Sequence, residues 1–285
     1  MACEDITEEK HFVRLFEETL ELNRGDISDD DISDAVIEVI NSFVGNIACP
    51  IKIYQTPERL WAYFFRFSPI SAGLTRFHML EAIRNNGALR TFLERSSLKV
   101  LSIGSGPGSD LIGLCSALYD NADFQKLNLT LVDNNERWRS LFQAMIHVIR
   151  HDEYGNASKL FQEKEINYSF ICSDVLNTAA YCDALSNADV VWMKGLLSVL
   201  SNNTVRYRAI RAVISSIPVG SLLVVIDSPT YHMFENFQDD LQLLYSAGAE
   251  SYYFSENPFK SYGPGLCRKS NQIITVHTKI WKGKN

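Results

Sequence analysis

The sequence lacks any long hydrophobic run. Its apolar stretches are short, such as the one from Leu222 to Ile226, whereas a membrane-spanning helix needs roughly 18 apolar residues. The N-terminal residues Met1-Ala-Cys-Glu-Asp are acidic and lack the basic and apolar regions of a signal peptide. We therefore expect a protein without a membrane-spanning segment and without a secretion signal.

The sequence also lacks a cysteine–histidine cluster with the ligand spacing of a zinc site, so no metal is expected. The six cysteines are scattered along the chain and form no C-x-x-C pair. In a large chain without a secretion signal, such cysteines are typical of reduced thiols. They predict a cytoplasmic protein and leave a nuclear location open.

The composition is that of a globular protein, with 46% hydrophobic and 21% charged residues among 285. That length suffices for one large domain or two smaller ones. The net charge of −7 is uneven: residues 1–34 carry twelve acids against three bases, whereas residues 251–285 carry six bases against one acid. The acidic segment fits a solvated outer helix. Because the negative net charge comes from that segment, it does not exclude an anionic substrate elsewhere on the protein.

Residues 1–96 have a helical pattern. A helix over 11–22 would place Phe12, Leu15, Phe16, Thr19 and Leu20 on one face, and Gly25 fits the end of that helix. Further helices are expected over about 32–48, from Thr56-Pro57 onward, and over about 74–94, since threonine can cap a helix and proline is tolerated at its first position.

From residue 98, short apolar runs alternate with amphipathic segments, which is typical of a parallel sheet with helices on both faces. The runs are 98–103, 128–133, 167–172, 188–193 and 221–227, and the intervening helices are 109–120, 135–150, 178–185 and 203–216.

The end of the chain breaks this alternation. We expect a helix at about 235–246, a strand at 250–254, a loop containing Asn257-Pro258 and Gly263-Pro264-Gly265, and a final strand at 272–281. No helix fits in that loop, and parallel neighbours need a long crossover, so the last strand is predicted to be antiparallel to the others.

The sharpest motif is a glycine-rich turn, Gly104-Ser105-Gly106-Pro107-Gly108, between the run at 98–103 and the helix from Ser109. Glycines let a backbone turn tightly and approach a ligand closely. The spacing is G-x-G-x-G rather than that of the dinucleotide fingerprint. Asp110 in the first helical turn would oppose a pyrophosphate, so a cofactor with positive charge, such as S-adenosylmethionine (SAM), suits the turn better.

Two carboxylates follow the next strands. Asp133 ends the second run, where it can accept both ribose hydroxyls, and Asp174 follows the third, where it can accept from an adenine amino group or close a turn. With the antiparallel last strand, residues 98–281 resemble the class I SAM-dependent methyltransferase family, which has a Rossmann-like α/β fold. The resemblance implies SAM as cofactor and these residues as its binding site: Ser102, Gly104, Ser105, Gly106, Gly108, Asp133, Asn134, Asp174, Val175 and Lys194.

One position, Ser102, departs from the pattern of that family, and Lys194 occupies a position that faces the reaction in the family. Ser102 stands where the family usually has an acid that holds the methionine amino group through water. Lys194 ends the fourth strand, at the position that faces the transferring methyl, and it can bind an anionic substrate or extend to solvent. The sequence Lys194-Gly-Leu-Leu also lacks the motifs of the family's amino-methylating enzymes that act on bases, its ribose 2′-O enzymes and its cytosine-C5 enzymes.

Residues 1–96 are predicted to form a helical cap and residues 97–285 the SAM-binding domain. Aromatic residues gather at 54–67, where a core role is favoured over an acceptor pocket, and Tyr63 and Arg66 are the candidate acceptor contacts. The arginines of 206–211 are better explained as a solvated helix face than as a nucleic-acid patch. The basic tail is a better anion-binding candidate; it comprises Lys260, Arg268, Lys269, Lys279, Lys282 and Lys284.

The resemblance predicts an enzyme that moves a methyl group from SAM to a small-molecule acceptor, with no catalytic residue assigned. An RNA or protein methyltransferase is the first alternative, supported by the basic C-terminal segment. A silent SAM-fold scaffold is the second, supported by Ser102. The oligomeric state is not indicated by the sequence.

Overall fold

The computed structural model describes residues 2–44, 56–228, 234–254 and 266–278. Its centre is a seven-stranded sheet with the strand order β3-β2-β1-β4-β5-β7-β6. Strand β7 is antiparallel to both β5 and β6, while β1 to β5 are mutually parallel. The sheet confirms the expected Rossmann-like α/β fold with an antiparallel last strand. The strands are β1 Ser97–Ile103, β2 Lys126–Asp133, β3 Glu165–Cys172, β4 Val190–Lys194, β5 Leu222–Asp227, β6 Leu241–Phe254 and β7 Leu266–His277.

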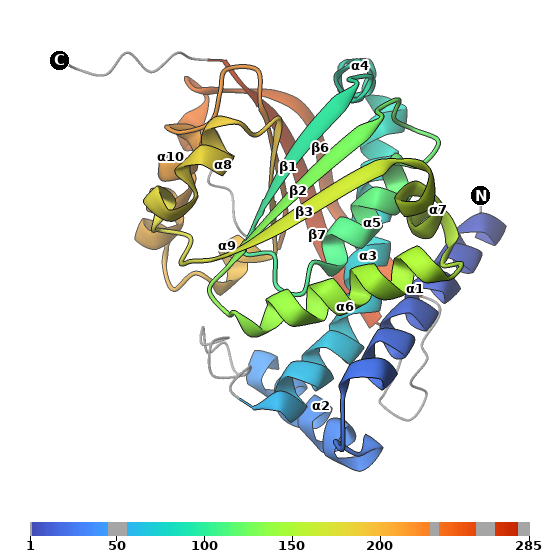
Figure 1. Ribbon diagram of the computed structural model, residues 1–285. Helices are drawn as coiled ribbons and strands as arrows, with labels where there is room; N and C mark the ends of the chain where they lie inside the picture. The colour runs from blue at the N-terminus through green and yellow to red at the C-terminus, as the bar shows by residue number, and fades with distance from the viewer. Residues whose placement is uncertain (1, 45–55, 229–233, 255–265, 279–285) are drawn as a thin grey trace.

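Helices cover both faces of the sheet (Figure 1). One face packs against helices that precede and follow the glycine turn: α3 Pro57–Asn85, α4 Gly87–Leu93, α5 Ser109–Leu118, α6 Arg137–His151 and α7 Gly155–Glu163. The other face packs against the short helices η2 Thr178–Tyr181, α8 Cys182–Ser186 and α9 Leu196–Val199, and against α10 Asn203–Ile214. Each face has its own apolar core because the sheet's side chains alternate in direction.

The N-terminal helices α1 Ala2–Asn23 and α2 Asp29–Val44 pack on the α3 side of the molecule. The apolar face predicted for α1 is confirmed, since Phe12, Leu15, Phe16, Thr19 and Leu20 are all buried. The four apolar side chains among them belong to the same continuous core as residues of β1, β4 and β5. The division into a cap of residues 1–96 and a domain of residues 97–285 stays a prediction. The helices of the proposed cap share one hydrophobic core with the sheet.

Helix α3 is longer than the sequence pattern indicates. Thr56 caps it as expected, its hydroxyl accepting from the Arg59 amide, but the helix runs unbroken to Asn85 with Pro69 inside it. The separate helix expected over 74–94 is therefore wrong: its first half belongs to α3, and α4 covers only the rest. Close packing against α5 holds α3 in place, because a Cβ at Gly113 would lie 2.1 Å from the Ala72 carbonyl oxygen.

The acidic first helix is not merely a solvated outer helix, which corrects the expectation from charge. Glu8 is buried, accepts from the Ser116 hydroxyl, and accepts from the Asn156 amide at 3.0 Å in the first turn of α7. Glu9 is also buried and accepts from the Tyr252 hydroxyl. Carboxylates at a helix N-terminus accept hydrogen bonds from unpaired amides and are attracted to the positive end of the helix dipole. These acids therefore attach α1 to the domain.

The helix expected at 235–246 is also wrong. Only a single 3₁₀ turn, η3 Phe234–Phe237, lies there, and β6 begins at Leu241 and pairs along its length with β7. Pairing with β7 outweighs the local helical pattern here. The pairing has register shifts between Leu243 and Tyr245 and between Ala247 and Glu250. The predicted loop at 255–265 and residues 279–281 of the predicted last strand lie outside the described residues.

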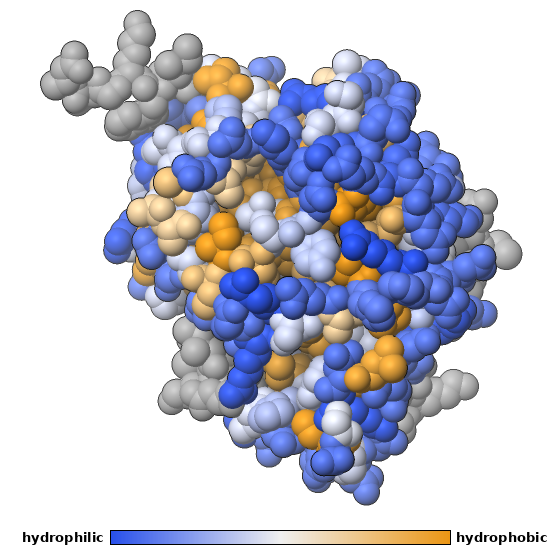
Figure 2. All heavy atoms as spheres, in the orientation of Figure 1, coloured by the Kyte–Doolittle hydropathy of each residue, from blue (hydrophilic) through white to orange (hydrophobic). Residues whose placement is uncertain are grey.

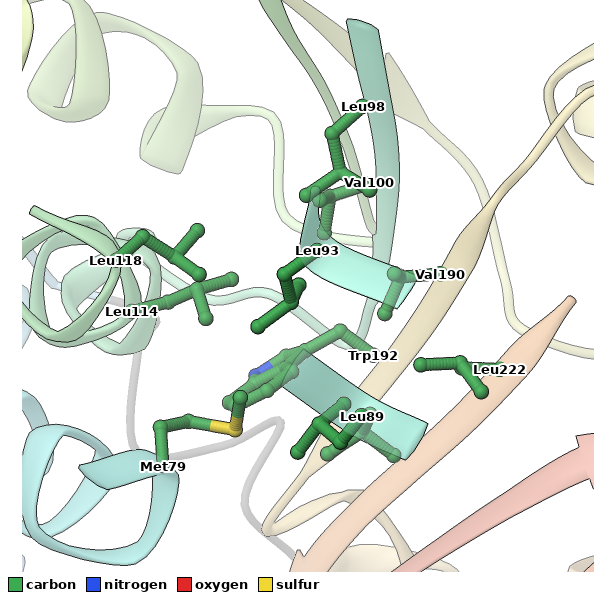
Figure 3. A pocket seen from close by; sticks show the side chains of 11 residues that line it. Met79, Leu89, Leu93, Leu98, Val100, Leu114, Leu118, Val190, Trp192 and Leu222 are labelled. Carbon is green, nitrogen blue, oxygen red and sulfur yellow. The ribbon is translucent and has the colours of Figure 1, made fainter. Parts of the chain in front are cut away.

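A small apolar cavity lies inside the core on the α3 side (Figure 3). Its lining comes from α3, α4, α5 and the amino-terminal halves of the strands, including Leu98, Val190 and Leu222. It is therefore at the opposite ends of the strands from the glycine turn. No polar side chain other than the Trp192 indole lines it, so it is a packing gap rather than a site for a polar ligand.

Candidate cofactor and acceptor site

The glycine turn follows β1 and leads directly into α5. Gly104, Gly106 and Gly108 all have positive φ, at 69°, 52° and 75°, a region that L side chains rarely adopt. The amides of Gly104 and Ser105 both donate to the Val132 carbonyl, at 2.8 and 3.1 Å, which ties the turn to the end of β2. The glycine pattern is thus required by the backbone conformation itself.

The three glycines differ in what surrounds them. A Cβ at Gly104 would lie 2.7 Å from the Leu196 side chain, and one at Gly108 would lie 2.5 Å from the Phe142 ring. A Cβ at Gly106 would meet nothing within 4 Å. Gly104 and Gly108 are needed for internal packing, whereas Gly106 borders open space that a ligand can enter.

Asp133 ends β2 beside this turn. Its Oδ2 accepts from the Gly106 amide at 2.8 Å, and its Oδ1 accepts from the Asn135 amide at 3.0 Å. Burial raises the pKa of the Asp133 carboxyl, and these backbone amides oppose that rise. The carboxylate is half-buried, with the exposed Asn134 next to it. Asp133 is thereby held against the glycine turn with part of its surface accessible.

Asp174 lies at the same edge of the sheet, two residues beyond Cys172, which pairs in register with Asp133. It is exposed, and its Oδ1 accepts from the Leu176 amide at 2.8 Å, so it closes a turn. Val175 is half-buried and packs against the second core. The turn hydrogen bond uses one carboxylate oxygen and leaves the other side of the group facing solvent.

Lys194 ends β4 and is turned toward α3. Its Nζ donates to the Ser71 hydroxyl at 2.6 Å. Burial, and to a smaller extent the positive charge of Lys194, lowers the pKa of the His78 imidazole to about 4. His78 Nε2 lies 2.8 Å from the Ser270 hydroxyl. The side chain is half-buried, which by itself favours neither anion binding nor extension to solvent.

Asp110, in the first turn of α5, is the most deeply buried acid near the glycine turn. Its Oδ2 accepts from the Trp192 indole N–H at 2.6 Å, and Trp192 pairs in register with Ser102. Burial raises the pKa of Asp110, while the charge of Lys194 lowers it. The Ser102 hydroxyl is buried and has no hydrogen-bond partner among the described residues.

Sequence reasoning did not find Asp227, which ends β5. It is buried, and its Oδ2 accepts from the Leu197 and Ser198 amides at 2.8 and 3.2 Å. It therefore fixes α9, the segment that follows Lys194 and places Leu196 against Gly104. Asp227 could have been identified in the sequence because it ends an apolar run, as Asp133 does.

The candidate acceptor residues lie on α3. Tyr63 is half-buried, with its ring centroid 5.8 Å from that of Trp138 at the start of α6, and Arg66 is buried. Tyr63 precedes Ser71 by eight residues, or about 12 Å along the helix. Tyr63 therefore lies near the α6 end of the site rather than beside Ser71.

The possible nucleic-acid patch is largely engaged internally. Arg206 donates to the carbonyls of Leu197 and Leu200, and Arg211 forms a salt bridge with Asp240 at 2.6 Å. Hydrophilic side chains cover most of the face in Figure 2, and apolar atoms appear around the position of α9 in Figure 1. These arginines stabilise the segment after β4 and the approach to β6.

Neither a metal cluster nor a membrane-spanning helix is found in the described parts of the chain. His147 and His151 lie one turn apart on α6, a spacing that the sequence reading overlooked, with ring centroids at 4.3 Å and ring planes tilted by 40°. No group of three or more histidine, cysteine or acidic side chains forms around them among the described residues.

The comparisons with known proteins agree with the Rossmann-like fold. A family model described as "Putative SAM-dependent methyltransferase" matches residues 51–237. The chain therefore belongs to this family of SAM-dependent methyltransferases, and the sequence resemblance is confirmed. The comparison with curated protein sequences returned no match.

Solved structures similar to this chain include three methyltransferases. Precorrin-6y C5,15-methyltransferase from Geobacter metallireducens is 15% identical, with 72% of this chain and 87% of that chain covered and a TM-score of 0.40. A SAM-dependent methyltransferase from Methanosarcina mazei is 13% identical, with coverages of 67% and 97% and a TM-score of 0.44. The N-methyltransferase NodS from Bradyrhizobium japonicum is 12% identical, with coverages of 72% and 94% and a TM-score of 0.40.

The residues present fit SAM as the cofactor. Gly106 borders open space, the Asp133 carboxylate lies beside it, and Asp110 places a carboxyl in the first turn of α5. A phosphate at that helix N-terminus would be repelled by Asp110, whereas the ammonium and sulfonium of SAM would be attracted.

Proposed function

We propose that this enzyme transfers the methyl group of SAM to a nucleophile on a small-molecule acceptor. The observation that carries the proposal is the hydrogen bond from Lys194 Nζ to Ser71. It brings α3 over the carboxyl end of β4, beside the glycine turn. A helix held over this end of the sheet restricts access to the site and favours a compact acceptor over a folded macromolecule.

For the cofactor, we propose that Asp133 accepts the two ribose hydroxyls and that Asp174 accepts from the adenine amino group. Gly104, Ser105, Gly106 and Gly108 would form the turn that the cofactor contacts. The remaining residues proposed around it are Ser102, Asn134, Val175 and Lys194. The support is the shared edge of the sheet that carries Asp133, Asp174 and the turn.

The proposed chemistry is an in-line displacement. When bound, SAM supplies an activated methyl group with its leaving group already in place, so the protein mainly has to position and desolvate the reactants. Asp227 fixes α9, α9 supports Gly104, and α3 excludes water from the end of β4. No side chain is proposed as a general base.

We also propose that residues 1–96 form the acceptor side of the site, with Tyr63 and Arg66 as acceptor contacts. The support is the position of α3, whose residues contact the sheet at Lys194 and α6 at Trp138. A fragment of residues 97–285 should expose an apolar face and lose methyl transfer. A soluble fragment with full activity would contradict this proposal.

The cofactor assignment is tested by calorimetry with S-adenosylhomocysteine (SAH). Asp133→Ala should weaken SAH at least tenfold, because charge-assisted hydrogen bonds are worth about 1.5–3 kcal/mol each and about 1.4 kcal/mol is one decade. The matched control is Asp123→Ala, an exposed acid in the turn before β2, at the other end of the sheet. Unchanged SAH affinity in a folded Asp133→Ala variant would remove this role.

The acceptor class is tested with methyl-labelled SAM. The enzyme is incubated separately with a small-molecule extract, total RNA and unfolded protein, and the label is followed into each fraction. We expect transfer into the small-molecule extract. Transfer into RNA, with binding that weakens steeply as salt rises, would favour the first alternative. SAH binding without transfer to any fraction would favour the silent scaffold.

We propose that the protein is located in the cytoplasm. The support is the scattered cysteines, of which Cys115, Cys172 and Cys182 are free thiols in the structure.

A further inference from the structure

A pair of exposed histidines lies on α6, away from the site described above, and no role has been assigned to it. His147 and His151 are four residues apart, and both side chains are exposed. Helix α6 begins at Arg137, shortly after the carboxyl end of β2, and at 1.5 Å per residue His151 lies about 20 Å farther along the helix. The pair is therefore at the opposite end of α6 from Asp133 and the glycine turn (Figure 1).

The two imidazole rings are close enough to hold one ion between them. Their centroids are 4.3 Å apart, and the ring planes are tilted by 40°. Residues four apart on a helix are neighbours on its surface, and this is the spacing at which two histidines of one helix bind a shared zinc ion. The backbone of α6 thus places both rings without any contribution from a loop.

One of the rings is already oriented for metal binding. His151 Nδ1 lies 2.6 Å from the His147 carbonyl oxygen. A carbonyl only accepts, so Nδ1 carries the hydrogen and, in the neutral imidazole, Nε2 keeps its lone pair. Metal-binding histidines are held in the same way, with one ring nitrogen donating to a carbonyl and the other on the metal. Neither Nε2 of His151 nor the His147 ring has a hydrogen-bond partner among the residues that the structure describes.

The charges around the pair favour a cation. The end of a helix carries unpaired carbonyls and the negative end of the helix dipole, and the pair is located there. Asp152 and Glu153 follow directly and are exposed. Arg150 is held on the sheet side of α6, where it donates to the Ile166 carbonyl at 2.8 Å. Arg14 is the other nearby base, and it lies 3.9 Å from Asp152 in an exposed, weak ion pair.

We propose that His147 and His151 bind one divalent transition-metal ion of the zinc, copper or nickel class, with His151 binding through Nε2. Imidazole suits these ions, whereas Mg²⁺ and Ca²⁺ prefer oxygen ligands. No third histidine, cysteine or acid joins the pair among the described residues, so water completes the coordination. The ion links two successive turns of α6 and stabilises the folded chain, because the unfolded chain does not hold the rings together.

The test uses the full-length chain after metal has been removed with a chelator. Calorimetry with Zn²⁺ should give one ion per chain, and Zn²⁺ should raise the melting temperature, while Mg²⁺ should do neither. His147→Gln and His151→Gln should each weaken Zn²⁺ at least tenfold, since even an outer partner of a ligand is worth about 10–100-fold in affinity. Both variants should fold normally, because both side chains are exposed.

The direct readout is the electron paramagnetic resonance spectrum of Cu²⁺ added at one equivalent. Coupling to two imidazole nitrogens is expected in the wild-type protein, and coupling to one in each histidine variant. The matched control replaces the two exposed thiols together, Cys172→Ala with Cys182→Ala, because thiolates also bind zinc. This control should keep its Zn²⁺ affinity within twofold of wild type.

Three results would overturn the site. The first is the absence of Zn²⁺ uptake by the wild-type protein. The second is Zn²⁺ affinity that is unchanged in both histidine variants, or that falls only in the cysteine variant, since the ion then binds elsewhere. The third is equal stabilisation by Mg²⁺, which would mean a general charge effect rather than binding by imidazole.

Discussion

Replacing Gly106 with alanine tests whether the cofactor approaches the glycine turn closely, because backbone strain should affect stability while a blocked approach should affect cofactor affinity. Gly106 has φ of 52°, and a Cβ there would meet nothing within 4 Å. The left-handed region costs an L residue roughly 1–2 kcal/mol, so we expect the free energy of unfolding to fall by about that amount. In a chain of this size the melting temperature should fall by about 2–8 °C. The fold should otherwise survive, because no neighbour is displaced.

Cofactor affinity should respond much more strongly. The added methyl group would project into the open space beside Asp133, where the proposed cofactor contacts the turn. We expect SAH to weaken at least tenfold by calorimetry, which corresponds to about 1.4 kcal/mol.

Two other glycines provide matched controls. Gly25→Ala has nearly the same backbone strain, with φ of 64° and no neighbour within 4 Å, but lies between α1 and α2. It should lose similar stability and keep its SAH affinity. Gly108→Ala should be the least stable, by about 3 kcal/mol or more, because its Cβ would lie 2.5 Å from the Phe142 ring. SAH affinity within twofold of wild type in Gly106→Ala would refute the proposed approach of the ligand.

Two further predictions concern stability. His78 has a folded pKa near 4, below the ordinary value of about 6.5, so its contribution is fully present above pH 6.5 and lost as pH falls toward 4. Urea unfolding should show a loss of up to about 3 kcal/mol over that range, and the same slope in His78→Gln would contradict the assignment. Glu8→Ala should lose at least about 2 kcal/mol, since Ser116 and the Asn156 amide lose a charged acceptor. The exposed Glu21→Ala should change stability by less than about 0.5 kcal/mol, and equal losses in the two variants would contradict the capping role of Glu8.

Local pattern was sufficient for the features that depend on local physics. The glycines at 104, 106 and 108 predict a tight turn, and the structure gives each of them a positive φ, which glycine adopts at little cost. The apolar face of α1 was predicted from helical spacing, and the strand ends at Asp133 and Lys194 from short apolar runs. The family, the fold and the cofactor followed from these elements in their order along the chain.

Tertiary packing decided the rest. The segment 235–246 has a helical pattern, yet its second half lies in β6 because β7 offers a partner along 241–254. Helix α3 continues through Pro69 because it packs closely on α5 at Gly113. In both cases a tertiary contact outweighs a local preference, which is of order 1 kcal/mol per residue in β6 and about 3 kcal/mol for a proline inside a helix.

The same limit applies to the site. The sequence by itself identified Lys194 and Asp110 but not their partners, Ser71 and Trp192, which lie 123 and 82 residues away along the chain. It treated the acids of α1 as solvated, although Glu8 caps α7 at a distance of 148 residues. Periodicity states which face of an element is apolar. Which polar groups meet across two elements depends on how those faces are packed together, and only the folded chain determines that.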